Sequence, residues 1–290
     1  MASYGKLAPA GSLYLVIDTD AAIGFVVAKG DPIDRARLAY LRTGATASEE
    51  VLSSVEAGQA RDGGWPAVIG GDMASIDATC FRLAELDDLG GLVRPAARRA
   101  LDWLASRQAA DGTWDEHPSL ADVAPPWAQP GDPEARLFVT ANAAFWLIVA
   151  GRDARSSGPL DDRPGGAYAG LAHAAAEALR SQVGNDGSLP TFLVAQWLAG
   201  AVLYRQEMYY ESARIQMRLT DRMPEFTAAD TAWLASSMRR VGVPPEDSLM
   251  VAALRRLAQT QRSDGGFESD DGPKFDVHTT LTAIRAVLTR

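Results

Sequence analysis

The stretch Gln108-Ala-Ala-Asp111-Gly112-Thr-Trp114 decides the fold, because the chain repeats it. Four copies share a Gln, an Asp-Gly pair three or four residues later, and a large apolar residue two places after the Gly. The other copies read Gln59-Ala-Arg-Asp62-Gly63-Gly64-Trp65, Gln182-Val-Gly-Asn185-Asp186-Gly187-Ser-Leu189 and Gln261-Arg-Ser-Asp264-Gly265-Gly266-Phe267. Each copy closes an apolar segment of helical period. Internal repetition of this kind predicts an architecture of repeated helical units.

The repeated phrase predicts a specific structural role. An Asp-Gly pair ends a helix, because Gly adopts the left-handed conformation at low cost and caps the last carbonyls. The Gln amide can bond the terminus of a neighbouring helix, and the aromatic ring can cover that bond. We therefore interpret the Gln, Gly and Trp residues as fasteners between helices.

A second regularity follows the phrases. Three segments carry a Thr with a Gly eleven positions later, which is about three helical turns. The pairs are Thr79 and Gly90, Thr140 and Gly151, and Thr231 and Gly242, while Ile33 precedes Gly44 and Thr279 precedes Arg290 by the same interval. This spacing predicts a second helix in each unit, at 33–42, 76–88, 137–150, 192–204, 229–241 and 277–288. First helices are expected at 48–59, 94–108, 169–182, 208–219 and 246–261.

The two helix sets differ in polarity. The second helices are apolar around most of their circumference, as in 145–150 and 192–199, and a helix of that kind is buried on every side. The first helices carry charged faces. An open solenoid and a closed ring are both possible for such an array, but an inner ring inside an outer ring satisfies both patterns. We predict an all-α (α/α)6 toroid with a central cavity.

The repeat sets the domain organisation. Residues 31–290 are predicted to form one toroid domain and residues 1–30 an N-terminal extension. Within the extension, 12–17 and 23–28 fit either a small β-hairpin or a degenerate helix pair. The segment 115–134 interrupts the repeat and is rich in Pro and acidic residues. It leads into the start of an inner helix at the expected cavity mouth, so its position is compatible both with a lid and with a plain surface loop.

Composition narrows the class of partner and the compartment. The net charge of −9 and the acidic pI near 4.9 argue against nucleic acid or an anionic membrane surface. The single Cys80 excludes an internal disulfide and is typical of a reducing cytosol, so we expect a cytoplasmic protein. No apolar run approaches the ~20 residues of a membrane span. Asp18 and Asp20 interrupt the N-terminal apolar stretch, so no signal peptide is expected.

The repeats resemble those of the squalene–hopene cyclase and protein prenyltransferase β-subunit superfamily, over roughly residues 33–290. The Gln-x-x-Asp-Gly-x-Trp loop resembles its QW motif. The resemblance implies working residues at the N-termini of inner helices, around the cavity mouth. Helix N-termini offer free N–H groups and positive potential.

The chain also departs from the motifs of this superfamily at several positions. Class II terpene cyclases carry a DxDDTA-like motif where this chain reads Thr227-Ala228-Ala229-Asp230-Thr231-Ala232, so Ala229 replaces the expected proton donor. In the zinc site of the prenyltransferases, Asp230 stands at the position of Cys and Ala228 at that of Asp. Cys80 lies in a distant repeat. We therefore expect no metal and no cofactor.

Four residues are candidate acid–base groups. Asp230 and His278 stand just before Thr231 and Thr279, on adjacent inner helices, and are expected to converge, with Asp276 orienting the imidazole. A nearby carboxylate raises the pKa of a histidine and suits it to acid–base work. The alternative is that Asp230 and Asp276 are helix caps and His278 a satisfied polar residue. Asp77 is a further mouth residue or an N-cap.

Aromatic residues mark the expected substrate surface. Terpene cyclases stabilise carbocations over aromatic faces, and six aromatic residues on or next to inner helices are candidates for this role. They are Phe138, Trp146, Phe192, Trp197, Trp233 and Phe275. The alternative is that they belong to the core.

Three functions are compatible with these observations. The first is an enzyme, in the isomerase or lyase class, that cyclises or isomerises an isoprenoid or similar apolar polyene by acid–base chemistry. The second is a non-catalytic toroid that holds a lipid or a partner. The third is a prenyltransferase-like subunit with a helical protein partner. A peripheral membrane contact is compatible with any of the three. The sequence pattern does not specify an oligomeric state.

Overall fold

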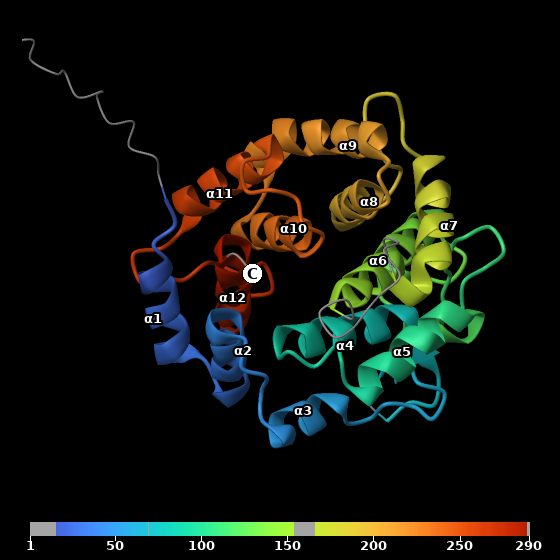
Figure 1. Ribbon diagram of the computed structural model, residues 1–290, viewed down its shortest axis with the longest axis horizontal. Coiled ribbons are helices and arrows are strands. Elements are labelled where there is room, and N and C mark those ends of the chain that lie inside the picture. Colours follow the sequence, from blue (N-terminus) through green and yellow to red (C-terminus); the bar gives the residue numbers. More distant parts are fainter. Residues whose placement is uncertain (1–15, 69, 154–165, 289–290) are drawn as a thin grey trace, which may run out of the picture.

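Helices alternate along the chain between an outer and an inner ring (Figure 1). The computed structural model describes residues 16–68, 70–153 and 166–288. The inner helices are α2 (Pro32–Thr43), α4 (Ile76–Asp88), α6 (Pro133–Asp153), α8 (Leu193–Arg205), α10 (Ala228–Arg240) and α12 (Asp276–Val287). The outer helices are α1 (Thr19–Lys29), α3 (Glu49–Glu56), α5 (Pro95–Ser106), α7 (Ala169–Arg180), α9 (Tyr209–Arg222) and α11 (Ser248–Thr260). The predicted all-α (α/α)6 toroid is confirmed.

Short elements connect the rings. Strands β1 (Trp65–Pro66) and β2 (Ala74–Ser75) form an antiparallel pair, with Trp65 opposite Ser75. The segment 115–134 contains two 3-10 helices, η1 (Pro118–Leu120) and η2 (Pro126–Ala128), and η2 packs against α6. The other 3-10 helices within the described residues are η4 (Gly166–Tyr168), η5 (Met223–Glu225) and η6 (Pro273–Phe275).

Part of the N-terminal extension belongs to the outer ring. Helix α1 starts after Asp18, whose side chain accepts a hydrogen bond from the backbone N–H of Ala21, and it packs against α12 and α2. The helical alternative therefore holds for 23–28, and residues 1–15 lie outside the described residues. The domain boundary at residue 31 stays a prediction.

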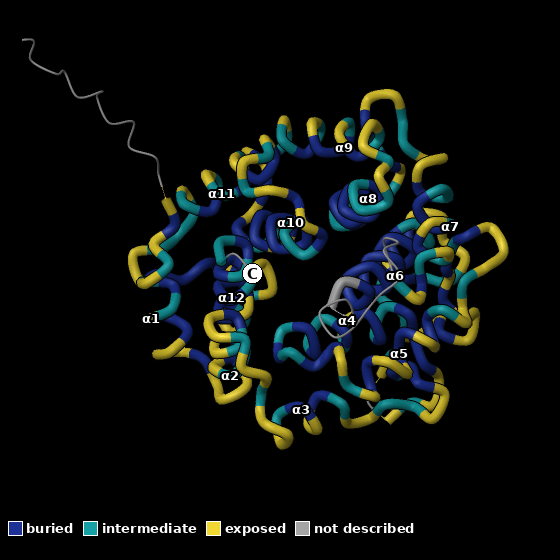
Figure 2. The backbone as a smooth tube through the Cα atoms, viewed as in Figure 1, coloured by how far each residue is buried: buried dark blue, intermediate teal, exposed yellow. Residues whose placement is uncertain are grey.

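The predicted burial of the inner helices holds for α8 but not for α2, which buries only Asp34, Leu38 and Leu41. In α8 every residue from Ala195 to Leu203 is buried, whereas the outer helices are buried on one side and exposed on the other (Figure 2). Helix α6 is long and apolar enough over Pro133–Gly151 to span a membrane, so our expectation that no segment approaches that length was wrong. That window is 83% buried inside the fold, which is typical of a core helix.

The repeated loops fasten neighbouring units. In three copies the Gln side-chain N–H donates to a backbone carbonyl at the start of the next outer helix. The pairs are Gln59 with Ala96 at 2.8 Å, Gln108 with Leu171 at 2.9 Å, and Gln261 with Asp18 at 2.9 Å. The last pair joins the end of α11 to the start of α1 and so closes the ring. In the part of the chain that the structure describes, the side chain of Gln182 bonds only Ser181, so the third copy departs from the prediction.

The loop glycines are required by close packing. Gly112 has a φ of 84°, and a Cβ there would lie 2.4 Å from the carbonyl oxygen of Ala174 in the next outer helix. Only Gly permits both the left-handed backbone and this approach. The phrase therefore sets the spacing of the outer ring as well as ending a helix.

Each of these three loops also forms a hydrogen bond with the inner helix that follows it. The backbone N–H of Trp114 donates to Thr140 Oγ1 at 2.9 Å, and that of Trp65 donates to Thr79 Oγ1 at 2.9 Å. In the last repeat the equivalent bond runs from Phe267 to Thr280, at 3.0 Å, and not to Thr279. Our assignment of Thr279 to this position was therefore wrong by one residue, because the hydrogen bond and not the eleven-residue spacing sets the register.

Candidate functional site

One face of α4 points toward the axis of the ring. Asp77 and Asp88 are eleven residues apart, so they share a helix face about 16 Å apart along the axis, and Phe81 lies one turn after Asp77. Asp88 bonds Arg37 of α2, Arg240 of α10 and Arg285 of α12, which places this face toward the centre. We call it the axial face of α4. Phe81 is 61% exposed although it lies on an inner helix.

Charged side chains cluster at the C-terminal end of the axial face. Asp87 and Asp88 meet Arg37, Arg240 and Arg285 in a buried cluster that we call the charge plug. Arg240 Nε lies 2.8 Å from Asp87 Oδ2, and Arg285 Nη2 lies 2.7 Å from Asp88 Oδ1. Arg240 also stacks on Trp146 of α6, 5.8 Å from the ring centroid. The charge plug therefore joins five of the six inner helices.

Electrostatics hold the charge plug together. Two acidic residues in the last turn of α4 oppose the helix dipole and need compensating cations. Burial disfavours the ionised form of Asp88, but Arg37, Arg285 and Arg240 outweigh that effect and hold its pKa well below the usual range. Burial lowers the pKa of Arg240, and the charge of Arg285 acts in the same direction. Asp88 is therefore an anion, and the charge plug is a structural tie.

The N-terminal end of the axial face carries a pair of carboxyl groups. Asp77 stands in the first turn of α4, and its Oδ2 accepts a hydrogen bond from Trp127 Nε1 at 3.1 Å. Glu116 is only 4% exposed, and its Oε1 accepts from Ser75 Oγ at 2.7 Å and from the Asp77 N–H at 2.9 Å. Its Oε2 accepts from the Ile76 N–H at 3.1 Å. We call Asp77, Glu116 and Trp127 the acid site.

Both carboxyl groups of the acid site hold a proton more tightly than usual. Burial raises the pKa of Asp77, and the hydrogen bond from Trp127 works against this effect. Burial also raises the pKa of Glu116; the bonds from Asp77, Ser75 and Ile76 lower it, and the nearby charge of Asp77 raises it further. Two adjacent carboxyls in one buried place do not ionise independently. The pair can therefore hold a proton at a higher pH than two isolated carboxyl groups would.

The thiol of Cys80 lies one turn into the same helix. Burial raises its pKa well above the usual range, with the charges of Asp77 and Glu116 adding to the effect. The thiol therefore stays protonated and is a poor nucleophile.

Asp230 is placed as a helix cap. The Asp230 N–H donates to Thr227 Oγ1 at 3.0 Å, and Asp230 Oδ2 accepts from the Thr227 N–H at 3.4 Å, which forms a capping box at the start of α10. No hydrogen bond or ion pair among the described residues joins Asp230 to His278. The convergence that we expected from their sequence positions is not found.

His278 has other partners. Its imidazole is 54% exposed, with Nε2 3.7 Å from Asp34 Oδ1 and Nδ1 3.3 Å from Arg37 Nη1. Asp276 does not orient this ring, because its Oδ2 lies 2.5 Å from Arg262 Nη1 and its Oδ1 accepts from the Ser269 N–H at 2.9 Å. That part of the prediction was wrong: Asp276 tethers the preceding loop. A catalytic role for His278 stays a prediction.

The predicted aromatic surface is mostly core. Phe138, Trp146 and Trp197 are buried, and Phe192 and Phe275 are partly buried. Trp233 is the exception at 42% exposure. Its ring stands edge-on to that of Trp197, with 5.7 Å between centroids.

Sequence reasoning missed three residues of this region. Glu116 and Trp127 lie in the segment 115–134, which we considered only as a lid or loop. Phe81 was overlooked although it follows Asp77 by one helical turn. An acidic residue and a Trp inside an insertion that begins at a repeat loop were the available signal.

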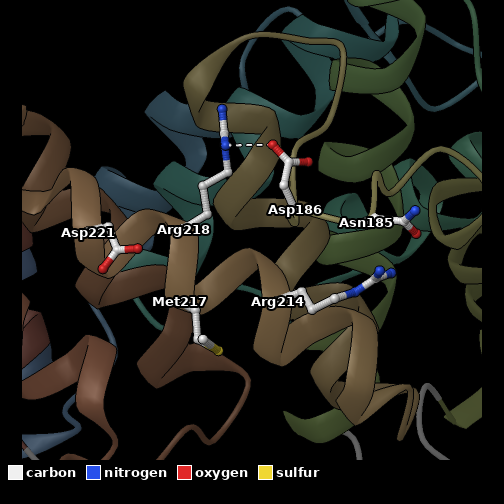
Figure 3. A pocket seen from close by; sticks show the side chains of 6 residues that line it. All are labelled: Asn185, Asp186, Arg214, Met217, Arg218 and Asp221. Atoms are coloured by element: carbon white, nitrogen blue, oxygen red, sulfur yellow. Dashed lines mark hydrogen bonds and ion pairs between the residues drawn. The ribbon is translucent and has the colours of Figure 1, made fainter.

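A separate groove of about 350 Å³ lies on the outer surface (Figure 3). It is lined by Asn185, Asp186, Arg214, Met217, Arg218 and Asp221. Its two cations and two carboxylates balance in charge, and Arg218 Nη1 pairs with Asp186 Oδ2 at 2.8 Å. The groove therefore offers no excess charge for a ligand, and the acid site is the better candidate.

Comparison with known proteins supports the fold. No protein-family model and no curated protein matches the sequence. A solved protein from Actinoplanes is similar at a TM-score of 0.58 and 17% identity, over 92% of this chain and 97% of that one. The type II terpene cyclase MstE from Scytonema is similar at 0.57 and 13% identity, over 93% and 96%. A substituted form of MstE, solved with its substrate geranylgeranyl dihydroxybenzoate, is similar at 0.51 and 14% identity, over 93% and 86%. The chain thus has a terpene cyclase-like fold.

Proposed function

We propose that the protein binds an apolar polyene of the isoprenoid class on the axis of the ring and protonates it from Asp77. The observation that carries this proposal is a carboxyl of raised pKa on the axial face, one turn from an exposed phenylalanine. A general acid works best when its pKa lies near the working pH. Support also comes from the fold, which is shared with a cyclase that acts on geranylgeranyl dihydroxybenzoate.

The chemistry needs only a proton and an alkene. The proton leaves Asp77 and forms a C–H bond with one alkene carbon, using the π electrons, so that a cation forms at the neighbouring carbon. A second alkene of the same substrate attacks that cation and closes a ring, or a proton is lost directly and the double bond moves. Loss of one proton at the end balances the proton gained, so the product is an isomer of the substrate.

Aromatic faces on the inner helices suit the intermediate cation. Phe81 and Trp233 both expose ring surface although they belong to the inner ring. An aromatic face stabilises a nearby cation by about 0.5–2 kcal/mol, depending on how far water is excluded. The proposed proton donor is Asp77 of α4. The degenerate motif at 227–232 contributes Asp230 as a helix cap and not as a proton donor.

The test is turnover of a polyprenyl probe. Geranylgeranyl dihydroxybenzoate, geranylgeraniol and squalene are incubated with the protein, and isomeric products are sought by mass-resolved chromatography. Asp77→Asn should lower kcat by about a hundredfold or more, since that is the usual size of a general acid effect. Asp20→Asn, in the first turn of the outer helix α1, is the matched control and should turn over normally. Equal turnover by Asp77→Asn and the unsubstituted protein would refute the assignment of the donor.

A non-catalytic toroid is the second candidate, and one observation favours it. Asp230 and Asp276, two of the expected catalytic residues, are engaged as a cap and a tether. Stoichiometric binding of these probes without any isomeric product would select this alternative. A helical protein partner, a peripheral membrane contact and a cytoplasmic location stay predictions of the sequence.

A further inference from the structure

Glu116 does the work of a helix cap from outside the helix. It accepts hydrogen bonds from the backbone N–H groups of Ile76 and Asp77 and from the hydroxyl of Ser75. Ser75 Oγ in turn accepts from the N–H of Ala78 at 3.1 Å. A carboxylate with three donors at a helix N-terminus is stabilised by those bonds and by the helix dipole. The ionised form of the pair is therefore best placed on Glu116.

Asp77 has far less support for a negative charge. Its Oδ2 accepts one bond, from Trp127, and its Oδ1 has no hydrogen-bond partner among the described residues. Burial raises its pKa, the hydrogen bond from Trp127 lowers it, and no described Lys, Arg or His pairs with it. Its neighbours Cys80 and Glu116 bring no positive charge. A single proton shared by the pair therefore belongs on Asp77, and Trp127 leaves Oδ1 as the oxygen that carries it.

We propose that Glu116 is a positioning residue, which stays ionised at the start of α4 and thereby keeps the transferable proton on Oδ1 of Asp77. This inference rests on the proposed function, in which Asp77 is the donor. When Asp77 gives up its proton, two carboxylates stand side by side. Their repulsion favours the return of a proton from solvent to Asp77 and resets the site. The segment 115–134 thus supplies half of the acid site.

The first experiment asks which carboxyl holds the proton, without any substitution. Infrared difference spectra between a pH just above the usual range of exposed carboxyl groups and alkaline pH should contain a protonated-carboxyl band. Isotope-labelled aspartate should shift this band, and isotope-labelled glutamate should leave it in place. A shift with labelled glutamate would put the proton on Glu116 and overturn the proposal.

The second experiment titrates that band in variants of the same segment. A neighbouring like charge raises the pKa of a carboxyl by about one to two units at an effective dielectric constant of about 20. Glu116→Gln should therefore raise the ionisation constant of Asp77 about ten- to a hundredfold. Trp127→Phe removes a bond to the ionised form and should shift the constant the other way. Asp115→Asn removes a charge next to Glu116 in sequence but outside the acid site, and it should change nothing.

The outcomes separate the two proposals. A band that Asp77→Asn does not remove means that Asp77 holds no proton, and the proposed function fails with it. Asp77→Asn could remove the band while the band titrates at the same pH in Glu116→Gln and in the unsubstituted protein. In that case Asp77 remains the donor, and the role of Glu116 is refuted. Shifts of the same sign in Glu116→Gln and Trp127→Phe would indicate general loosening of the segment and also refute it. Melting curves confirm that each variant is folded.

Discussion

Replacing Gly265 by Ala should open the ring at its closure point. Gly265 has a φ of 87°, and a Cβ there would lie 2.2 Å from the carbonyl oxygen of Ala21 in α1. The left-handed backbone costs about 1–2 kcal/mol, and relief of the clash by moving α1 costs about 1–3 kcal/mol. That movement also weakens the two hydrogen bonds between Gln261 and Asp18, each about 0.5–1.5 kcal/mol.

The expected loss is therefore about 3–8 kcal/mol, or a fall in Tm of roughly 6–16 °C at about 2 °C per kcal/mol for a chain of this size. Gly58→Ala is the matched control, because Gly58 also has a left-handed φ, of 80°, but no atom within 4 Å of the added Cβ. It should lose only about 1–2 kcal/mol. Thermal and urea unfolding measure both variants. Equal losses in the two variants would show that the contact between the fourth loop and α1 does not close the ring.

Three further predictions concern stability. Trp114→Ala should cost about 3–5 kcal/mol by urea unfolding, because its ring is fully buried. Trp114→Phe keeps an aromatic ring and should cost less, through the lost indole bond to Leu104, about 1 kcal/mol, and the lost part of the buried ring volume. Asp88→Asn should cost about 3–5 kcal/mol at neutral pH. Because the folded pKa of Asp88 is depressed, its contribution is present above a pH of about 4 and lost as pH falls below it. Asp77 has a raised folded pKa, so stability should fall as pH rises from about 4 through that pKa, and Asp77→Asn should lack this fall.

The candidate site was only partly predictable. Asp77 was among the expected residues because it begins an inner helix, and that reasoning needs only the helix period. Glu116 reaches the same place across forty residues of chain, through hydrogen bonds to Ser75, Ile76 and Asp77. A pairing of that kind depends on where an irregular segment folds back, and no periodicity encodes it.

The expected pair of Asp230 and His278 failed for a related reason. Both are the third residue of an inner helix. The loop hydrogen bond to Thr280 nevertheless shifts the register of α12 by one residue, so Thr279 and not His278 corresponds to Asp230. Side-chain direction, however, follows from local partners. The Asp230 carboxylate accepts a hydrogen bond from the Thr227 N–H at the start of its own helix, while Asp34 and Arg37 of α2 lie against His278. The expected pair therefore failed both in its register and in the direction of its side chains.

The sequence by itself determined the architecture of this protein, because that information is local and repeated. The phrase Gln-x-x-Asp-Gly-x-Trp ends one helix and presents an amide, a glycine and an aromatic ring at fixed intervals, and the polarity of the helices assigns them to the inner or outer ring. Only the tertiary structure decided the electrostatics. Asp88 gains its low pKa from cations on three other helices, and Asp77 its raised pKa from burial beneath the segment 115–134. Charge interactions depend on distance in space and on exclusion of water, and both exist only once the ring has closed.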